Sequence, residues 1–128
     1  TEPSLRIQSE RVIIVDDDPD VAEMLVWSLH EIGYLPQLMH DPAALLARVA
    51  EQPPGLIIID VDLGVRSGLA VTQELRLSGY TGSIIVFSGA NNTNTRQAAK
   101  AAGADAFLAK PLDMPKFLAW MKRLLPGA

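Results

Sequence analysis

Short runs of consecutive apolar residues recur along the chain, and each run ends abruptly at a polar residue. The most marked is Leu56-Ile57-Ile58-Ile59, which follows a Pro-Pro-Gly break and ends in Asp60. A run this short, without polar alternation, predicts a strand that is buried on both faces of a sheet. The same pattern predicts further strands at 11–16, 83–88 and 106–109, and a weaker one at 35–40.

Apolar residues at helical spacing lie between the predicted strands. Asp18 and Asp41 are capping residues, each followed by proline, and both predict the start of a helix. Helices are predicted from Asp18 to about Gly33, and at about 42–52, 69–77, 95–102 and 113–125. The Asn- and Thr-rich residues 89–95 predict a mobile loop. The helix after this loop has mostly Ala on its inner positions, so we expect it to be held less firmly than its neighbours.

Five strands that alternate strictly with five helices predict an α/β fold, with a doubly wound parallel sheet and right-handed crossovers. A length of 128 residues favours one domain. We predict that residues 11–125 form this domain, that 1–10 are an N-terminal extension and that 126–128 are a C-terminal tail. Because the chain begins with Thr1, we expect the extension to be an excised or processed end.

Composition narrows the functional classes. Cys is absent, which excludes disulfides and thiolate metal sites and is compatible with a cytoplasmic location, our expectation here. No apolar run approaches the ~20 residues that span a bilayer, so no membrane segment is predicted. The net charge of −4 argues against nucleic acid as a direct partner.

Polar residues that could carry chemistry stand at the ends of the predicted strands, namely Asp16-Asp17, Asp60, Ser88 and Lys110. The carboxyl ends of parallel strands share one edge of the sheet, where ligands bind in such folds. Carboxylates ~4 Å apart repel by about 4 kcal/mol per pair near a protein surface. Such a cluster needs protons or a cation, and oxygen ligands favour Mg²⁺ (or Mn²⁺).

The same residues suit phosphoryl transfer. An Asp carboxylate is a recognised covalent acceptor of phosphoryl groups, Lys110 supplies a positive charge and Ser88 a hydroxyl donor. Each residue also has an ordinary interpretation: the acid pair as a helix cap, Asp60 and Ser88 as turn residues, and Lys110 as a surface cation. The consistent chemistry of the set favours the functional interpretation.

The order and spacing of four motifs resemble the receiver domain of response regulators in two-component signal transduction, of the chemotaxis-regulator type. The motifs are Val15-Asp16-Asp17-Asp18-Pro19, Ile59-Asp60 with Leu63 and Gly68, Val86-Phe87-Ser88-Gly89, and Gly103-Ala104-Asp105 leading to Lys110-Pro111. The resemblance covers about residues 11–125. It implies a flavodoxin-like fold with strand order 2-1-3-4-5, an order for which the chemotaxis regulator is a known example.

The resemblance also implies roles for the site residues. Asp60 would be the phosphoacceptor, served by a histidine kinase or a phosphotransfer protein of a phosphorelay. Mg²⁺ would be held by Asp17 directly, by Asp16 largely through water, by Asp60, and by the main-chain carbonyl of Asp62. Lys110 would pair with Asp60 at rest and with the phosphoryl group of the aspartyl phosphate afterwards.

A conformational switch is implied as well. Ser88 would move toward the phosphoryl group, and Phe107 would turn into the space that Ser88 leaves; alternatively, Phe107 is simply part of the core. The Lys110-Pro111 peptide bond would be cis. We expect the change to reach residues 89–95 and the following helix, and to control an output partner that the sequence does not identify. A homodimer formed on phosphorylation is compatible with this scheme.

Two positions depart from the family pattern. Gly64 stands where Pro is frequent, and the acidic side chain of Asp62 could either approach attacking water or point to solvent. Asp60 with Asp62 also resembles the catalytic pair of haloacid-dehalogenase-like phosphatases, which is the alternative function. That interpretation lacks the usual Gly-Thr after the second Asp and leaves Asp16-Asp17 unexplained. We therefore predict a phosphoacceptor domain that assists its own phosphorylation and dephosphorylation, and not an enzyme that turns over substrate.

Overall fold

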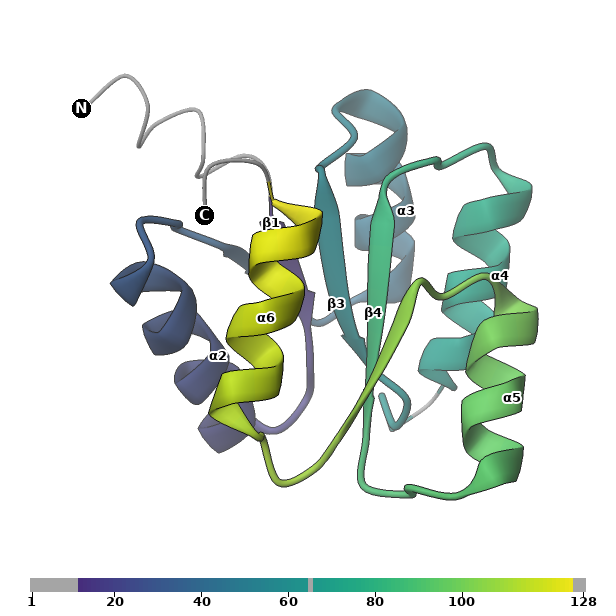
Figure 1. Ribbon diagram of the computed structural model, residues 1–128. Helices are drawn as coiled ribbons and strands as arrows, with labels where there is room; N and C mark the ends of the chain where they lie inside the picture. The colour runs from purple at the N-terminus through teal and green to yellow at the C-terminus, as the bar shows by residue number, and fades with distance from the viewer. Residues whose placement is uncertain (1–11, 65, 126–128) are drawn as a thin grey trace.

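Five strands and five helices alternate along the part of the chain that the computed structural model describes, residues 12–64 and 66–125 (Figure 1). The strands are β1 (Val12–Val15), β2 (Gln37–Met39), β3 (Leu56–Asp60), β4 (Ser83–Ser88) and β5 (Ala106–Ala109). The helices are α2 (Pro19–Glu31), α3 (Pro42–Glu51), α4 (Gly68–Leu77), α5 (Thr93–Ala102) and α6 (Met114–Leu124). The predicted extension and tail lie outside the described residues. No helix among those described is long and apolar enough to cross a membrane.

The strands form one parallel sheet in the order β2-β1-β3-β4-β5, which confirms the predicted fold class. Val15 of β1 pairs with Ile59 of β3, and Ile59 pairs in turn with Val86 of β4. This register aligns the carboxyl ends of the central strands. The polar residues that end these strands therefore reach the same edge of the sheet.

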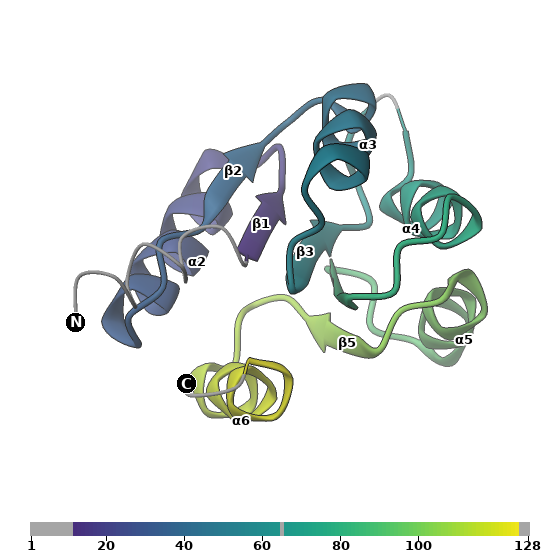
Figure 2. The same cartoon turned by 90° about the horizontal axis from the view of Figure 1, so that it is seen from above.

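Helices cover both faces of the sheet, and side chains alternate between them. Seen from above, α2 and α6 lie on one face and α3, α4 and α5 on the other (Figure 2). Ile14 and Ile58 pack into a core with α2 and α6, whereas Ile13 and Ile57 pack into a second core with the other three helices. Because both faces are buried, the strands show no polar alternation in sequence.

Helix starts follow the capping residues, with one correction. The side chain of Asp18 accepts hydrogen bonds from the first turn of α2, and Asp41 does the same for α3. Helix α5 begins at Thr93 and not near residue 95 as predicted, because Asn92 caps it by accepting a hydrogen bond from the Thr95 amide. The predicted loop at 89–95 therefore ends at Asn92. The predicted strand at 35–40 is likewise shorter, at Gln37–Met39.

Candidate functional site

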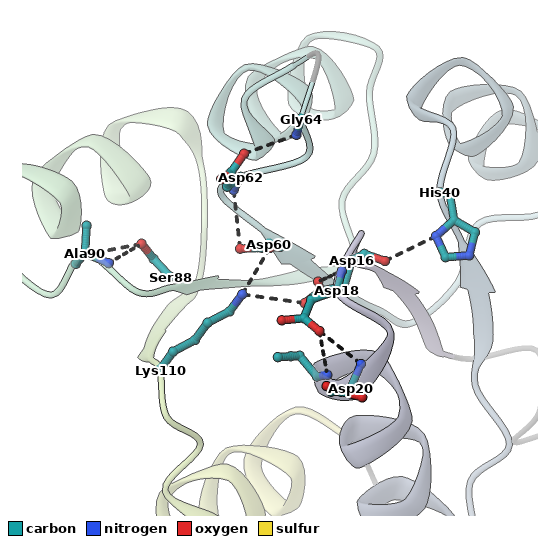
Figure 3. A network of polar contacts seen from close by, with 11 residues as sticks. Asp16, Asp18, Asp20, His40, Asp60, Asp62, Gly64, Ser88, Ala90 and Lys110 are labelled. Atoms are coloured by element: carbon teal, nitrogen blue, oxygen red, sulfur yellow. Dashed lines mark hydrogen bonds and ion pairs between the residues drawn. The ribbon is translucent and has the colours of Figure 1, made fainter.

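The side chains of Asp16, Asp60 and Lys110 converge at the carboxyl edge of the sheet, and Ser88 lies at the same edge (Figure 3). Asp60 and Ser88 are the last residues of β3 and β4, while Asp16 and Lys110 directly follow β1 and β5. The Lys110 amide donates to the Ser88 carbonyl at 2.8 Å, which fixes the end of β5 against β4. The sheet register therefore sets the spacing of the site.

An ion pair joins the two central residues of the site. Nζ of Lys110 donates to Oδ2 of Asp60 at 3.1 Å and lies 4.0 Å from Oδ2 of Asp16. Asp60 is only 5% exposed, and a buried carboxylate requires such a partner. The ammonium group also lies 5.4 Å from the centre of the Phe87 ring, which orients it further.

Asp16 is the least satisfied polar group of the site. It is 1% exposed, and its Oδ1 accepts from the Asp18 amide at 2.8 Å. Its Oδ2 has no hydrogen-bond partner among the described residues. Burial, reinforced by the charge of Asp60 and opposed by the Asp18 amide and Lys110, raises the pKa of Asp16 to about 6. A buried carboxylate oxygen that lacks a hydrogen bond and lies beside a second carboxylate fits a divalent cation.

Asp17 does not join the other two carboxylates. It is exposed, and its Oδ2 lies 3.1 Å from the point where a Cβ on Gly64 would stand. Within residues 12–64 and 66–125, no three His, Cys, Asp or Glu side chains are grouped so that they could hold a metal ion as they stand. The structure thus brings Asp16 and Asp60 together and leaves Asp17 at the rim, against the loop that follows β3.

The loop after β3 is shaped by hydrogen bonds to its own acids. The Asp62 amide donates to Oδ1 of Asp60 at 3.3 Å, and the exposed Asp62 carboxylate accepts from the Gly64 amide at 3.1 Å. The Asp62 side chain is therefore exposed to solvent and turned away from Asp60, in agreement with the second of the two interpretations drawn from the sequence. A Cβ on Gly68 would lie 1.9 Å from the Asp60 carbonyl oxygen, so only glycine lets α4 begin this close to the site.

Ser88 and Phe107, the predicted switch residues, contact the loop after β4 and helix α5, respectively. Oγ of Ser88 accepts from the Ala90 amide at 3.0 Å, so the hydroxyl is held by the loop after β4. Phe107 is half-buried, and the guanidinium carbon of Arg96 lies 4.8 Å from the centre of its ring. The Lys110-Pro111 peptide bond is cis.

Two residues that contact the site or its predicted switch, His40 and Arg96, were not identified from the sequence. Nδ1 of His40 lies 3.2 Å from the main-chain oxygen of Asp16 and braces the end of β1 from the neighbouring strand (Figure 3). A signal for His40 existed, because it is a polar residue at the end of a predicted strand. No sequence signal pointed to Arg96, whose contacts depend on how α5 packs beside β5.

Comparisons with known proteins agree with this geometry. The family model described as "Response regulator receiver domain" matches residues 12–122. The response regulator MprA of Mycobacterium ulcerans is 37% identical over 117 residues, which cover 91% of this chain and 50% of that protein. MprA of Mycobacterium avium is 36% identical, over 90% of this chain and 50% of that protein. The chain thus spans about half the length of these curated relatives.

Solved structures of response regulators also resemble this chain. A putative response regulator from Chloroflexus aurantiacus superimposes with a TM-score of 0.83 at 28% identity, covering 91% of this chain and 97% of that one. The chemotaxis protein CheY4 of Vibrio cholerae superimposes with a TM-score of 0.81 at 26% identity, covering 90% and 98%. The receiver domain of the regulator TorR gives 0.80 at 28% identity, covering 91% and 96%. This chain therefore belongs to the family of response regulator receiver domains.

Proposed function

We propose that this receiver domain is a phosphorylation-controlled binding module in which Asp60 accepts a phosphoryl group. The donor is a phosphohistidine of a histidine kinase or of a phosphotransfer protein. The observation that carries the proposal is the pairing of Lys110 Nζ with the buried Asp60 carboxylate at 3.1 Å. Membership of the receiver family favours this function over the phosphatase alternative.

The chemistry at Asp60 follows from its surroundings. A carboxylate oxygen bonds to phosphorus as the bond between phosphorus and the imidazole nitrogen breaks, and that nitrogen keeps the electron pair. Lys110 already stands beside Oδ2 and can pair with a phosphoryl oxygen. Ser88 can donate to another phosphoryl oxygen once its hydroxyl leaves the Ala90 amide.

A divalent cation, Mg²⁺ or Mn²⁺, completes the proposed site. Asp16, Asp60 and the main-chain carbonyl of Asp62 would hold it, joined by Asp17 after its side chain turns away from Gly64. When bound, the ion would neutralise the carboxylates and the phosphoryl oxygens. The support for this assignment is the buried Asp16 Oδ2, which has no hydrogen-bond partner in the described part of the chain.

Signalling would follow from the added charge. A phosphoryl group brings about −1.5 to −2 charges and new hydrogen-bond acceptors next to Ser88 and Lys110. A change of about 1.4 kcal/mol shifts a two-state ratio tenfold, so a small bias is sufficient. We propose that Ser88, Phe107 and α5 carry this bias to an output partner, and that the same change can favour a homodimer.

Phosphorylation by a small donor tests the assignment. With Mg²⁺ and acetyl phosphate, we expect the intact protein to gain the mass of one phosphoryl group, because Asp60 and Lys110 are already paired. Asp60→Asn should gain none, whereas Asp62→Asn should still gain one, because the Asp62 side chain faces away from the site. Equal gains in the wild type and in Asp60→Asn would contradict the proposal.

A further inference from the structure

Arg96, near the start of α5, contacts two segments that the proposed switch must move. Its Nε donates to Oδ1 of Asn91 at 2.9 Å, in the loop after β4. Its guanidinium carbon lies 4.8 Å from the centre of the Phe107 ring, in β5. One side chain therefore ties the loop to the ring.

The loop end of this tie leads back to the phosphoryl site. The Ala90 amide donates to the Ser88 hydroxyl at 3.0 Å (Figure 3). Asn91 is the next residue along the chain. If Ser88 turns toward a phosphoryl oxygen, it releases Ala90, and Asn91 is free to shift. Such a shift would pull on the hydrogen bond to Arg96. The contacts thus run without a gap from Ser88 to Phe107.

Packing against the core beside α3, α4 and α5 buries only part of the Phe107 ring. The ring borders two open hollows of about 390 and 490 Å³, and both are also lined by Arg96 and Trp120. A half-buried aromatic ring with space around it can change rotamer without opening the core. The cation–π contact with Arg96 therefore restrains the ring in addition to its packing.

We propose that Arg96 is a positioning residue that latches the unphosphorylated conformation. Its hydrogen bond to Asn91 and its contact with Phe107 hold the loop and the ring in their resting places, and activation must break both. The inference rests on the proposed function, because it assumes that a phosphoryl group on Asp60 drives the change. Beyond the proposed function, the inference assigns Arg96 the role of opposing the conformational change.

The latch predicts a change in affinity for a phosphoryl mimic. By linkage, a contact made only in the resting state weakens binding of any ligand that favours the other state. Beryllium fluoride with Mg²⁺ is the probe, and its dissociation constant is measured by titration. We expect Arg96→Gln to bind about fivefold to seventyfold tighter than the wild type, the size expected for one exposed cation–π contact plus one hydrogen bond.

A matched control separates the latch from a general loss of surface charge. The guanidinium carbon of Arg123 lies 4.8 Å from the centre of the Trp120 ring, the same distance as in the Arg96 pair. Arg123→Gln removes an equivalent contact away from the loop and should leave the affinity unchanged. Asn91→Ala should reproduce part of the gain, and the double variant Asn91→Ala with Arg96→Gln should gain less than the sum of the two single effects.

A second readout follows the ring itself. In NMR spectra without beryllium fluoride, Arg96→Gln should move the Phe107 ring resonances toward their positions in the wild-type complex. Unchanged resonances and unchanged affinity in Arg96→Gln, with binding still abolished by Asp60→Asn, would overturn the latch and leave the phosphoacceptor assignment standing. If the wild type itself does not bind the probe, the proposed function fails, and the latch fails with it.

Discussion

Asp16 and Asp60 are carboxylates on neighbouring strands, yet their surroundings differ. Lys110 Nζ lies 3.1 Å from Asp60 but 4.0 Å from Asp16, so the cation mainly neutralises one of the two acids. Asp16 is left buried, with one oxygen that has no hydrogen bond among the described residues, and burial raises its pKa to about 6. The resting site is therefore electrostatically unfavourable, and a divalent cation or a neutral substitution should relieve it.

Asp16→Asn should stabilise the domain when metal is absent. The amide can keep the hydrogen bond from the Asp18 amide and donate to Asp60, and it removes one of two adjacent buried charges. We expect the free energy of unfolding in EDTA to rise by about 1–2 kcal/mol at neutral pH. Urea denaturation of the wild type and the variant measures this difference in the free energy of unfolding.

The control for this variant is Asp20→Asn, which changes an exposed acid in the first turn of α2. Its stability should stay the same or fall slightly, since an acid there interacts favourably with the start of the helix. The gain in Asp16→Asn should shrink when Mg²⁺ is added, because the wild type then binds a stabilising ligand. A loss of stability in Asp16→Asn without metal would show that the acid pair is not under strain.

Helices α4 and α5 are fixed to each other through one arginine and one glycine. Arg76, in the last turn of α4, donates to the Gly103 carbonyl at 2.9 Å and to the Asp105 carboxylate at 2.9 Å. Gly103 ends α5 with a φ of 109°, in the left-handed region. This joint anchors the far end of α5, so movement is expected at its start, where Arg96 lies.

A pair of glycine substitutions tests this joint. Gly79 and Gly103 both have positive φ, of 101° and 109°, but a Cβ on Gly79 meets nothing within 4 Å, whereas one on Gly103 would lie 2.5 Å from Cγ of Arg76. Gly79→Ala should cost about 1–2 kcal/mol from backbone strain alone. Gly103→Ala should cost more in urea denaturation, because Arg76 must also move. Equal costs would mean that Arg76 does not hold the joint.

The bounds of some helices and strands were predicted more accurately from the sequence than those of others. Strands β3 and β4 were predicted well because each is a continuous apolar run ended by a polar residue. The start of α5 was placed too late, because Asn and Thr suit both a loop and the first turn of a capped helix. Capping is decided by the hydrogen bonds that the Asn92 side chain accepts from Thr95, which composition does not reveal.

At the scale of the whole molecule, the sheet topology explains why the position of the site could be predicted from the sequence, whereas the individual side-chain contacts around it could not. Parallel strands with aligned ends bring Asp16, Asp60 and Lys110 to one edge, whatever the details of packing. The direction of the Asp17 carboxylate and the contacts of His40 and Arg96 depend on rotamers and on helix placement. These contacts follow from three-dimensional packing; residue order gives at most a position, as for His40 at the end of a predicted strand.

Trapping the phosphorylated residue tests the central assignment most directly. Borohydride reduces an aspartyl phosphate to homoserine, so the protein is incubated with Mg²⁺ and acetyl phosphate, reduced, digested and mapped by mass spectrometry. We predict homoserine at Asp60 alone, because Asp60 is the buried acid paired with Lys110 at the end of β3. Homoserine at Asp16, Asp17 or Asp62, or at no position while the phosphoryl group remains attached to the protein, would contradict the assignment.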